Sequence, residues 1–125
     1  MWKWLVGIAL IAAVALVGTD ATQANSKDGP RRWKRTIKGN SEVVYKIVFK
    51  AETSDARKRA EFIILGDGST DVDVFVEDAS GKQITSDIGY SDMGLVRWIP
   101  PKTQEYTIRV KNLGNEDNVV QMGHN

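Results

Sequence analysis

The sequence has no cysteine among its 125 residues. Disulfide bonds, iron–sulfur clusters, zinc–thiolate centres and cysteine nucleophiles are therefore all excluded. It has a single histidine, His124, beside the last residue, where we expect the chain to fray. A histidine base needs a fixed place beside its nucleophile, so a Ser-His-Asp hydrolase is not expected. We predict that the protein is not an enzyme.

Net charge is also nearly absent, because 17 Lys and Arg residues stand against 16 Asp and Glu residues. Such a balance gives no general reason to expect binding to nucleic acid or to a membrane. The sequence also lacks an apolar run of about 20 residues, the length that a membrane-spanning helix needs. An uncharged run, Leu5 to Val17, follows Lys3-Trp4 and precedes Gly18-Thr19. This layout is typical of a secretory signal peptide, which forms a helix.

We expect residues 1–24 to be this signal peptide. Small residues at the two positions that a signal peptidase reads place the cleavage after Ala24, with cleavage after Ala21 and an uncleaved membrane anchor as alternatives. The mature chain of about 100 residues suits one domain with one core. An exported domain without disulfides must be held together by packing alone, which favours the periplasm or the exterior of a bacterium.

What the sequence does contain is alternation of apolar and other residues. It runs with a period of two through residues 43–51, 71–77 and 105–111, the pattern of strands with one buried face. Shorter strands are predicted at residues 60–65, 82–86, 95–99 and 119–122. Turn residues separate the strands about every ten residues, and no helical period occurs after the signal peptide. The sequence therefore predicts an antiparallel β-sandwich or barrel.

A polar, basic segment precedes these strands, at residues 25–41. Its charged residues include Arg31, Arg32, Lys34, Arg35 and Lys38. We interpret the segment as a linker or a loosely docked arm. Alternatives are that it binds an anionic surface, such as lipid headgroups or cell-wall polymer, or that it folds back on the acidic strand of residues 71–77.

Several motifs can be compared with a known family. They are the strand Val43–Ala51, the segment Gly66–Gly81 with its Asp-x-Asp-apolar-aromatic-Val strand and Asp-x-x-Gly turn, the segment Val96–Pro100, and the segment Tyr106–Gly114. Together they resemble the bacterial pre-peptidase C-terminal domain and its small secreted relatives over residues 42–123, although Thr103-Gln104 stands where the family has Thr-Gly. The resemblance implies a non-catalytic, jelly-roll-like β-sandwich of the kind attached to secreted peptidases. Some relatives bind substrate polymers or calcium.

Oxygen-bearing side chains occur at every second position in one part of the Gly66–Gly81 segment. Asp67, Ser69, Asp71 and Asp73 can turn their oxygens in one direction, and calcium prefers oxygen ligands completed by carbonyls and waters. The alternative is a solvent-facing acidic edge that caps turns and deters edge-to-edge pairing. Calcium is therefore a candidate ligand, and no cofactor is required.

Three aromatic residues are candidates for a carbohydrate-binding platform: Phe75 on the acidic strand, Tyr90 in a loop, and Trp98. Packing in the core is the alternative, and for Trp98 it is the favoured one. The predicted function is an exported, non-catalytic interaction module. A carbohydrate-binding module and an accessory protein to a separately encoded secreted peptidase are the alternatives. The expected partners are an envelope polymer, a polysaccharide or a secreted protein, with no nucleic acid and with membrane contact only through the signal peptide.

Overall fold

The computed structural model of the protein describes residues 26–52 and 59–125. The elements in this part of the chain are all strands, so it holds no helix long and apolar enough to cross a membrane. In chain order the strands are β1 (Arg31–Ile37), β2 (Glu42–Phe49), β3 (Ala60–Leu65), β4 (Val72–Glu77), β5 (Gln83–Asp87), β6 (Met93–Trp98), β7 (Gln104–Asn112) and β8 (Asn118–His124). The predicted signal peptide, with its cleavage after Ala24, lies outside the described residues.

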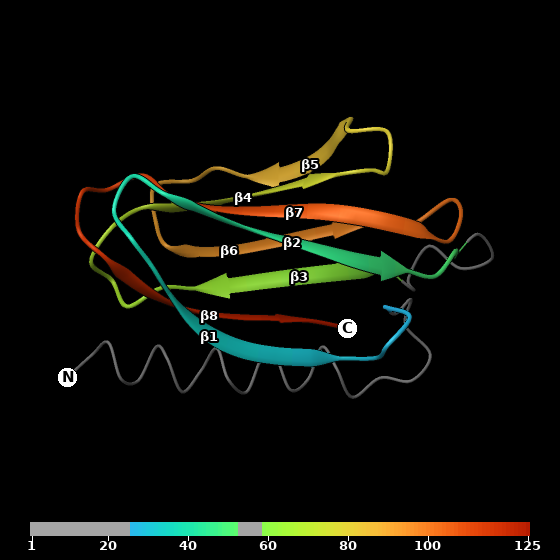
Figure 1. Ribbon diagram of the computed structural model, residues 1–125, viewed down its shortest axis with the longest axis horizontal. Helices are drawn as coiled ribbons and strands as arrows, with labels where there is room; N and C mark the ends of the chain where they lie inside the picture. Colours follow the sequence, from blue (N-terminus) through green and yellow to red (C-terminus); the bar gives the residue numbers. More distant parts are fainter. Residues whose placement is uncertain (1–25, 53–58) are drawn as a thin grey trace.

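The strands form two four-stranded antiparallel sheets that pack against each other (Figure 1). Sheet A has the order β2-β7-β4-β5, and sheet B has the order β1-β8-β3-β6. This arrangement confirms the predicted all-β antiparallel sandwich. The seven strands that alternation and turn residues predict correspond to β2 to β8.

Alternation decides which side chains enter the core between the sheets. In β4 the three valines point inward, while Asp73, Phe75 and Glu77 point outward. The buried core is apolar and draws on both sheets; it consists of Ile37, Val43, Phe49, Ala60, Phe62, Ile64, Val72, Val74, Val76, Val96, Trp98, Tyr106, Ile108, Val110, Val120 and Met122. Burial of this apolar surface is the main force that holds a domain without disulfides together. Because every one of these residues follows residue 25, a chain that begins at Asn25 carries the complete sandwich.

Strand β1 corrects the expectation of a linker or loosely docked arm over residues 25–41. It pairs with β8 along its whole length, from Arg31 opposite His124 to Ile37 opposite Asn118. Ile37 is buried, and the Trp33 ring lies edge-on to Tyr45 with 5.1 Å between the centroids. The strand looks polar in the sequence because Arg35 takes the inward position between these two residues. Its guanidinium lies 6.0 Å from the centre of the Tyr45 ring, a cation–π contact that suits the rim of the core. The sandwich therefore begins at Arg31 and not at residue 42.

The expectation of a fraying end at His124 is also wrong. His124 closes β8, which is held between β1 and β3, and its imidazole is buried. The ring stacks on Phe62 at 6.4 Å and meets Phe49 edge-on at 5.6 Å. Burial lowers the pKa of His124 below its ordinary value of 6.5, against the opposing effect of the hydrogen bond to the Asn125 carbonyl. The imidazole is thus a neutral part of the aromatic core at neutral pH.

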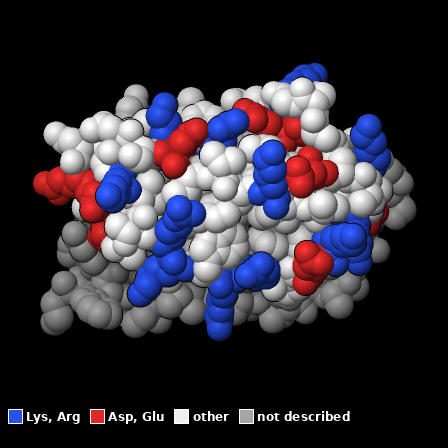
Figure 2. All heavy atoms as spheres, viewed as in Figure 1, with Lys and Arg blue, Asp and Glu red and all other residues white. Residues whose placement is uncertain are grey.

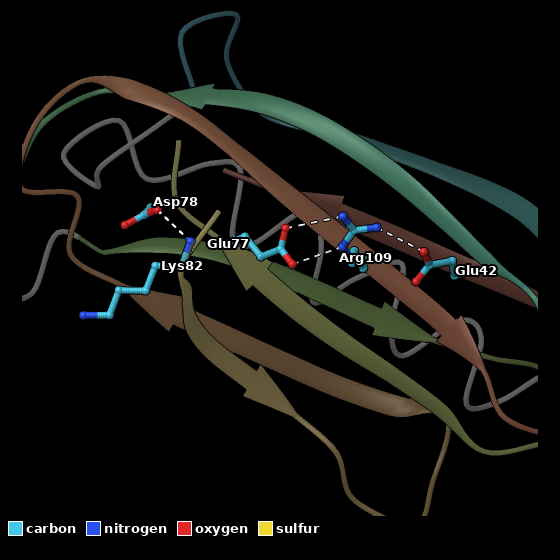
Figure 3. Close-up of polar contacts among 5 residues, drawn as sticks. All are labelled: Glu42, Glu77, Asp78, Lys82 and Arg109. Atoms are coloured by element: carbon cyan, nitrogen blue, oxygen red, sulfur yellow. Dashed lines mark hydrogen bonds and ion pairs between the residues drawn. The ribbon is translucent and has the colours of Figure 1, made fainter. Parts of the chain in front are cut away.

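The predicted hairpin between β4 and β5 has the turn that its residues indicate. Oδ1 of Asp78 accepts hydrogen bonds from the backbone N–H groups of Ser80 (2.9 Å) and Lys82 (3.1 Å; Figure 3). Gly81 has a φ of 87°, a left-handed conformation that favours glycine. The hydrogen bond from the Ser80 hydroxyl has the largest effect in holding the pKa of Asp78 below its ordinary value of 3.8, and these backbone hydrogen bonds lower it further.

Candidate functional site

Four connections meet at one end of the sandwich, on the left in Figure 1: residues 38–41, 66–71, 88–92 and 113–117. Two fully buried asparagines, Asn112 and Asn118, join these connections. Asn112 Nδ2 donates to the carbonyls of Ile37 (2.9 Å) and Glu116 (2.8 Å), while its Oδ1 accepts from the Thr70 hydroxyl (2.7 Å). A buried amide that satisfies several groups at once fixes their relative positions. Asn112, at the end of β7, therefore ties the end of β1 and the β7–β8 connection to the segment that precedes β4.

Asn118 links the remaining connection to the same group. Its Oδ1 accepts from the backbone N–H of Asp67 at 2.8 Å. Its Nδ2 donates to Thr70 Oγ1 at 3.0 Å and to Asp92 Oδ2 at 3.1 Å. The connection that contains Asp92 is thereby fixed to the segment between β3 and β4. These contacts form one buried polar network beneath the loops.

Asp92 anchors the second half of the connection between β5 and β6. Its carbonyl accepts from Gly66 N at 2.8 Å, and its Oδ2 accepts from Gly68 N at 2.6 Å. Glycine is required at position 66, because a Cβ there would collide with the side chains of Asp92 and Asn118. The Ser91 carbonyl accepts from Val72 N at 3.3 Å. Residues 91 and 92 are therefore held against β4 and the β3–β4 connection.

Asp87 anchors the first half of the same connection. Its Oδ2 accepts from Leu95 N at 3.0 Å, which joins the edge of sheet A to the edge of sheet B. Its Oδ1 lies 3.4 Å from Gly89 N, a long hydrogen bond. Between the two anchors the chain turns outward and presents Ile88, which is 63% exposed, and Tyr90, which is fully exposed. We call residues 88–92 the apical loop. The loop exposes two large apolar side chains to solvent, while Asp87 and Asp92 fix its two ends.

The four residues predicted to bind calcium do not form one cluster. The Asp67 carboxylate accepts hydrogen bonds from Ser69 N (3.0 Å) and from Val119 N (3.0 Å), so both of its oxygens serve the fold. The Ser69 hydroxyl donates to the same carboxylate and to the Asp117 carbonyl. In the described parts of the chain, no three Asp, Glu or His side chains lie close enough to hold a metal ion.

Asp71 and Asp73 are the members of that set with unused oxygens. Each has a buried Oδ1 without a hydrogen-bond partner. Burial raises the pKa of Asp73 above its ordinary value of 3.8, the neighbouring carboxylates of Asp71 and Asp87 add to the rise, and Lys111 opposes it. Asp73 lies opposite Lys111 in the register of β4 and β7. Its charge therefore has a cationic neighbour within the sheet.

The rest of the acidic strand is also paired with the neighbouring strand. Arg109 of β7 donates from Nε to Glu77 at 3.1 Å and from Nη1 to Glu42 of β2 at 3.0 Å (Figure 3). One guanidinium thus joins three adjacent strands of sheet A across the outer face. Phe75 is half-buried on this face, opposite Arg109. The outward acids of β4 are matched by basic residues of β7, which supports the interpretation of this strand as a structural element.

The three rings predicted to form a carbohydrate platform do not share a surface. Trp98 is only 7% exposed and packs in the core, with its ring 5.0 Å from Phe49 and 5.3 Å from Tyr106. Phe75 lies on the outer face of sheet A, and Tyr90 stands on the apical loop. Since Trp98 presents no free ring face, the structure leaves Tyr90 as the one fully exposed ring of the three.

Sequence reasoning identified Tyr90 but missed the residues that position its loop. In the sequence alone, nothing distinguishes Asn112 and Asn118 from ordinary turn and strand-end residues. In the same way, Asp87 and Asp92 look like ordinary polar loop residues. A usable signal was present: the two aspartates bracket the loop at its ends, and Asn112-x-Gly114 marks a turn in which an asparagine bonds the backbone two residues on. The Gly114 N–H does donate to Asn112 Oδ1, at 3.1 Å.

No protein-family model matches the sequence, and no curated protein sequence matches it significantly. Solved structures do match the fold. The pre-peptidase C-terminal domain of a collagenase from Bacillus anthracis superposes with a TM-score of 0.57 at 12% identity, covering 76% of this chain and 88% of that one. PliG of Aeromonas hydrophila, a periplasmic inhibitor of g-type lysozyme, superposes with a TM-score of 0.54 at 18% identity, covering 76% of this chain and 83% of that one. The Yersinia pseudotuberculosis-derived mitogen superposes with a TM-score of 0.52 at 13% identity, covering 77% of this chain and 84% of that one.

These likenesses are at the level of the fold. They confirm that the chain has the small β-sandwich of the pre-peptidase C-terminal domain, which the motifs of residues 42–123 resemble. The same sandwich occurs in a periplasmic lysozyme inhibitor and in a domain of a collagenase.

Proposed function

We propose that the protein is an exported, non-catalytic binding module that docks a partner protein through the apical loop. The observation that carries this proposal is the full exposure of Tyr90 on a loop whose two ends are fixed by Asp87 and Asp92. A single exposed apolar residue is common on protein surfaces. Here two exposed apolar side chains, Tyr90 and Ile88, lie two positions apart on a loop whose base is fixed, so they are not an isolated exposed residue.

An anchored loop binds at a lower entropic cost than a mobile one. Tyrosine is enriched among the residues that dominate protein–protein affinity, because a rigid ring brings a large contact area with few rotatable bonds. The buried contacts of Asn118, Asp92 and Gly66 hold the loop base before any partner arrives. The loop therefore has the properties of a pre-organised protein-binding element.

A catalytic role finds no support in the same residues. The one histidine of the chain, His124, is enclosed by Phe49, Phe62 and Trp33. A general base needs to reach a substrate proton within hydrogen-bond distance, which a ring inside the core cannot do. Binding, and not chemistry, is the function that the site favours.

The chemistry around the loop suggests what kind of protein would fit. Glu116 and Asp117 are exposed on the neighbouring connection, and Asn118 joins that connection to Asp92. An acidic rim beside two apolar anchors suits a partner with a basic surface and a small apolar pocket. By analogy with a periplasmic lysozyme inhibitor and a collagenase domain, we propose an exported enzyme, a lysozyme or a peptidase, as the partner class. The predicted role as an accessory protein falls within this class.

The test begins with identification of the partner. A tagged chain beginning at Asn25 is incubated with extracts of exported proteins, and the captured protein is then purified and titrated against variants. Tyr90→Ala is expected to weaken binding by about 2 kcal/mol, roughly 30-fold, with Ile88→Ser next in effect. Ile99→Ser provides the matched control, because Ile99 is an exposed apolar residue outside the loop.

Equal affinity of the wild type and Tyr90→Ala for the captured protein would contradict the loop assignment. A polysaccharide pull-down performed in parallel addresses the carbohydrate alternative. If polysaccharide were retained by the wild type and lost in Tyr90→Ala, while no protein were captured, the loop would be a sugar site instead.

A further inference from the structure

The backbone of β1 has an open edge, because β1 is the outermost strand of sheet B. In an antiparallel sheet, the N–H and C=O groups of one residue point to the same neighbouring strand, and those of the next residue point to the opposite side. The Val119 N–H donates to Asp67 Oδ2 just beyond the end of β3, so the residues on either side of Val119 face β1. These residues lie opposite the odd-numbered residues of β1. The even-numbered residues, among them Lys34 and Thr36, therefore point their N–H and C=O groups away from β8. In the described parts of the chain, no hydrogen bond from a loop backbone reaches those groups of Lys34 and Thr36.

The other edges of the sandwich are covered at least in part. The edge of β2 is closed near its end, where the Val48 carbonyl accepts from Lys27 N at 2.7 Å. The edges of β5 and β6 are joined by the hydrogen bond from Leu95 N to Asp87 Oδ2. Uncovered edges are the places where a sheet accepts a further strand. The middle of the β1 edge is therefore the part of the sandwich best suited to strand addition.

The side chains of β1 give this edge a positive charge. Arg31 and Arg35 take inward positions together with Trp33, yet both are exposed, so they reach the open side of the sandwich. Lys34 is exposed on the outer face. Among the described residues, these three cations form no ion pair with an acidic side chain. Figure 2 shows Lys and Arg side chains gathered over β1, in the lower middle of the view.

We propose that the β1 edge binds an extended acidic segment of another protein, which adds to sheet B as a fifth, antiparallel strand. In such strand addition, backbone hydrogen bonds provide affinity and alternate side chains provide specificity. The antiparallel direction is that of every strand pair in the sandwich. The cations disfavour a second copy of β1 as the added strand, because like charges opposite each other destabilise a sheet, whereas opposite charges stabilise it.

The spacing of the cations specifies the segment further. Arg31 and Arg35 are four residues apart on one side of the strand, about 13 Å, with the half-buried Trp33 midway between them. Side chains that lie directly opposite each other in an antiparallel pair are about 5 Å apart. A matching segment therefore has the pattern acid-x-apolar-x-acid. This edge lies on the opposite side of sheet B from β6, which follows the apical loop, so the two surfaces are separate.

The first arm of the experiment titrates a chain that begins at Asn25 into a fluorescein-labelled peptide, Thr-Thr-Glu-Thr-Val-Thr-Glu-Thr-Thr, and measures fluorescence anisotropy. Thr36→Pro should weaken binding roughly tenfold or more, since proline removes an edge N–H but no hydrogen bond between β1 and β8. Thr36→Ala is the matched control and should bind like the wild type. Arg31→Gln with Arg35→Gln should weaken binding roughly tenfold. Tyr90→Ala should leave it unchanged, which separates this site from the apical loop.

The second arm distinguishes strand pairing from simple attraction of charges. In the proposed register the valine of the peptide lies opposite Trp33, so the two threonines beside the valine donate to the β1 edge and the valine N–H points away. N-methylation of those two threonines should abolish binding, and N-methylation of the valine should not.

Absence of binding to the wild type, equal binding to Thr36→Pro, or equal affinity of the two methylated peptides would overturn the proposal. Equal binding of a peptide with Lys in place of Glu would also overturn it. So would a wild-type dimer that dissociates in Thr36→Pro while the peptide fails to bind, because the edge would then pair with a second copy. Circular dichroism establishes that each variant is folded, and sedimentation measures its oligomeric state.

Discussion

Strands β4 and β1 each carry side chains of one charge sign, yet the fold treats them differently. β4 lies inside sheet A, where Arg109 and Lys111 of β7 stand opposite Phe75 and Asp73. β1 lies at the edge of sheet B, beside uncharged residues of β8. Glu77 of the inner strand forms an ion pair with Arg109, whereas Arg31, Lys34 and Arg35 of the edge strand form no ion pair with an acidic side chain of the described residues. The position of a charged strand in its sheet therefore decides whether its charges support the fold or face a partner.

The largest effect is expected from removing the aromatic residue that fixes β1 to the core. Trp33 packs against Tyr45, Phe62 and His124, so Trp33→Ala should lower the free energy of unfolding by about 3 kcal/mol. Urea denaturation at neutral pH measures this loss. Lys34→Ala, next to it but exposed, should change it by less than about 0.5 kcal/mol. Small losses in both variants would mean that β1 is a dispensable arm after all.

A smaller loss is expected from breaking the charge network of sheet A. Arg109→Met removes the contacts to Glu77 and Glu42, and the melting temperature should fall by a few degrees. The difference from the wild type should shrink as salt is added, since the network is partly exposed. Arg31→Met removes a cation that has no ion-pair partner among the described residues, and it should leave the melting temperature unchanged. The comparison of the two strands fails if Arg31→Met destabilises the protein as much as Arg109→Met.

The two acids at opposite ends of β4 should respond oppositely to neutralisation. The pKa of Asp73 is raised in the folded protein, so its ionisation costs stability as the pH rises above 3.8. Asp73→Asn should therefore raise the melting temperature modestly at neutral pH, with a gain that fades below that pH. The pKa of Asp78 is lowered, so its contribution is present above 3.8 and is lost as the pH falls through the folded value.

Asp78→Asn should accordingly lower the melting temperature at neutral pH and have less effect in acid. Melting curves of both variants between acidic and neutral pH measure the pair. If both substitutions changed the melting temperature in the same direction, burial would not raise the pKa of Asp73 while hydrogen bonding lowers that of Asp78.

The smallest effect is expected from calcium. The carboxylate of Asp67 is already engaged by Ser69 N and Val119 N, and Asp73 has Lys111 beside it in the register. Addition of millimolar calcium should leave the melting temperature of the wild type unchanged, as should EDTA. A calcium-dependent rise that is absent in Asp71→Ala would instead restore the metal site predicted from residues 67–73.

Much of the fold could be predicted because period-two alternation reports burial directly. The inward valines of β4 and the inward Tyr106, Ile108 and Val110 of β7 follow the predicted pattern. β1 escaped prediction because its inward position between Trp33 and Ile37 is Arg35, which breaks the apolar pattern. A cation–π contact with a residue of another strand replaces the missing apolar side chain, and this contact is not encoded locally.

The candidate site was less predictable for a related reason. The exposed position of Tyr90 follows from a loop of Gly, Ser and Asp residues, which the sequence displays. The burial of Asn112 and Asn118 depends on which connections meet at one end of the sandwich, and that depends on the strand order. The acids from Asp67 to Asp73 looked like one ligand set because they share a spacing. The structure directs Asp67 to β8 and Asp73 toward β7, so that spacing did not produce a cluster.

The central claim is that the apical loop, and not the acidic strand, meets a protein partner. The most direct test is site-specific photocrosslinking in cells, with a photoreactive amino acid in place of Tyr90 or, in a second variant, of Phe75. The account predicts a crosslinked adduct with another exported protein at position 90 and none at position 75. An adduct at position 75 with none at position 90 would contradict it.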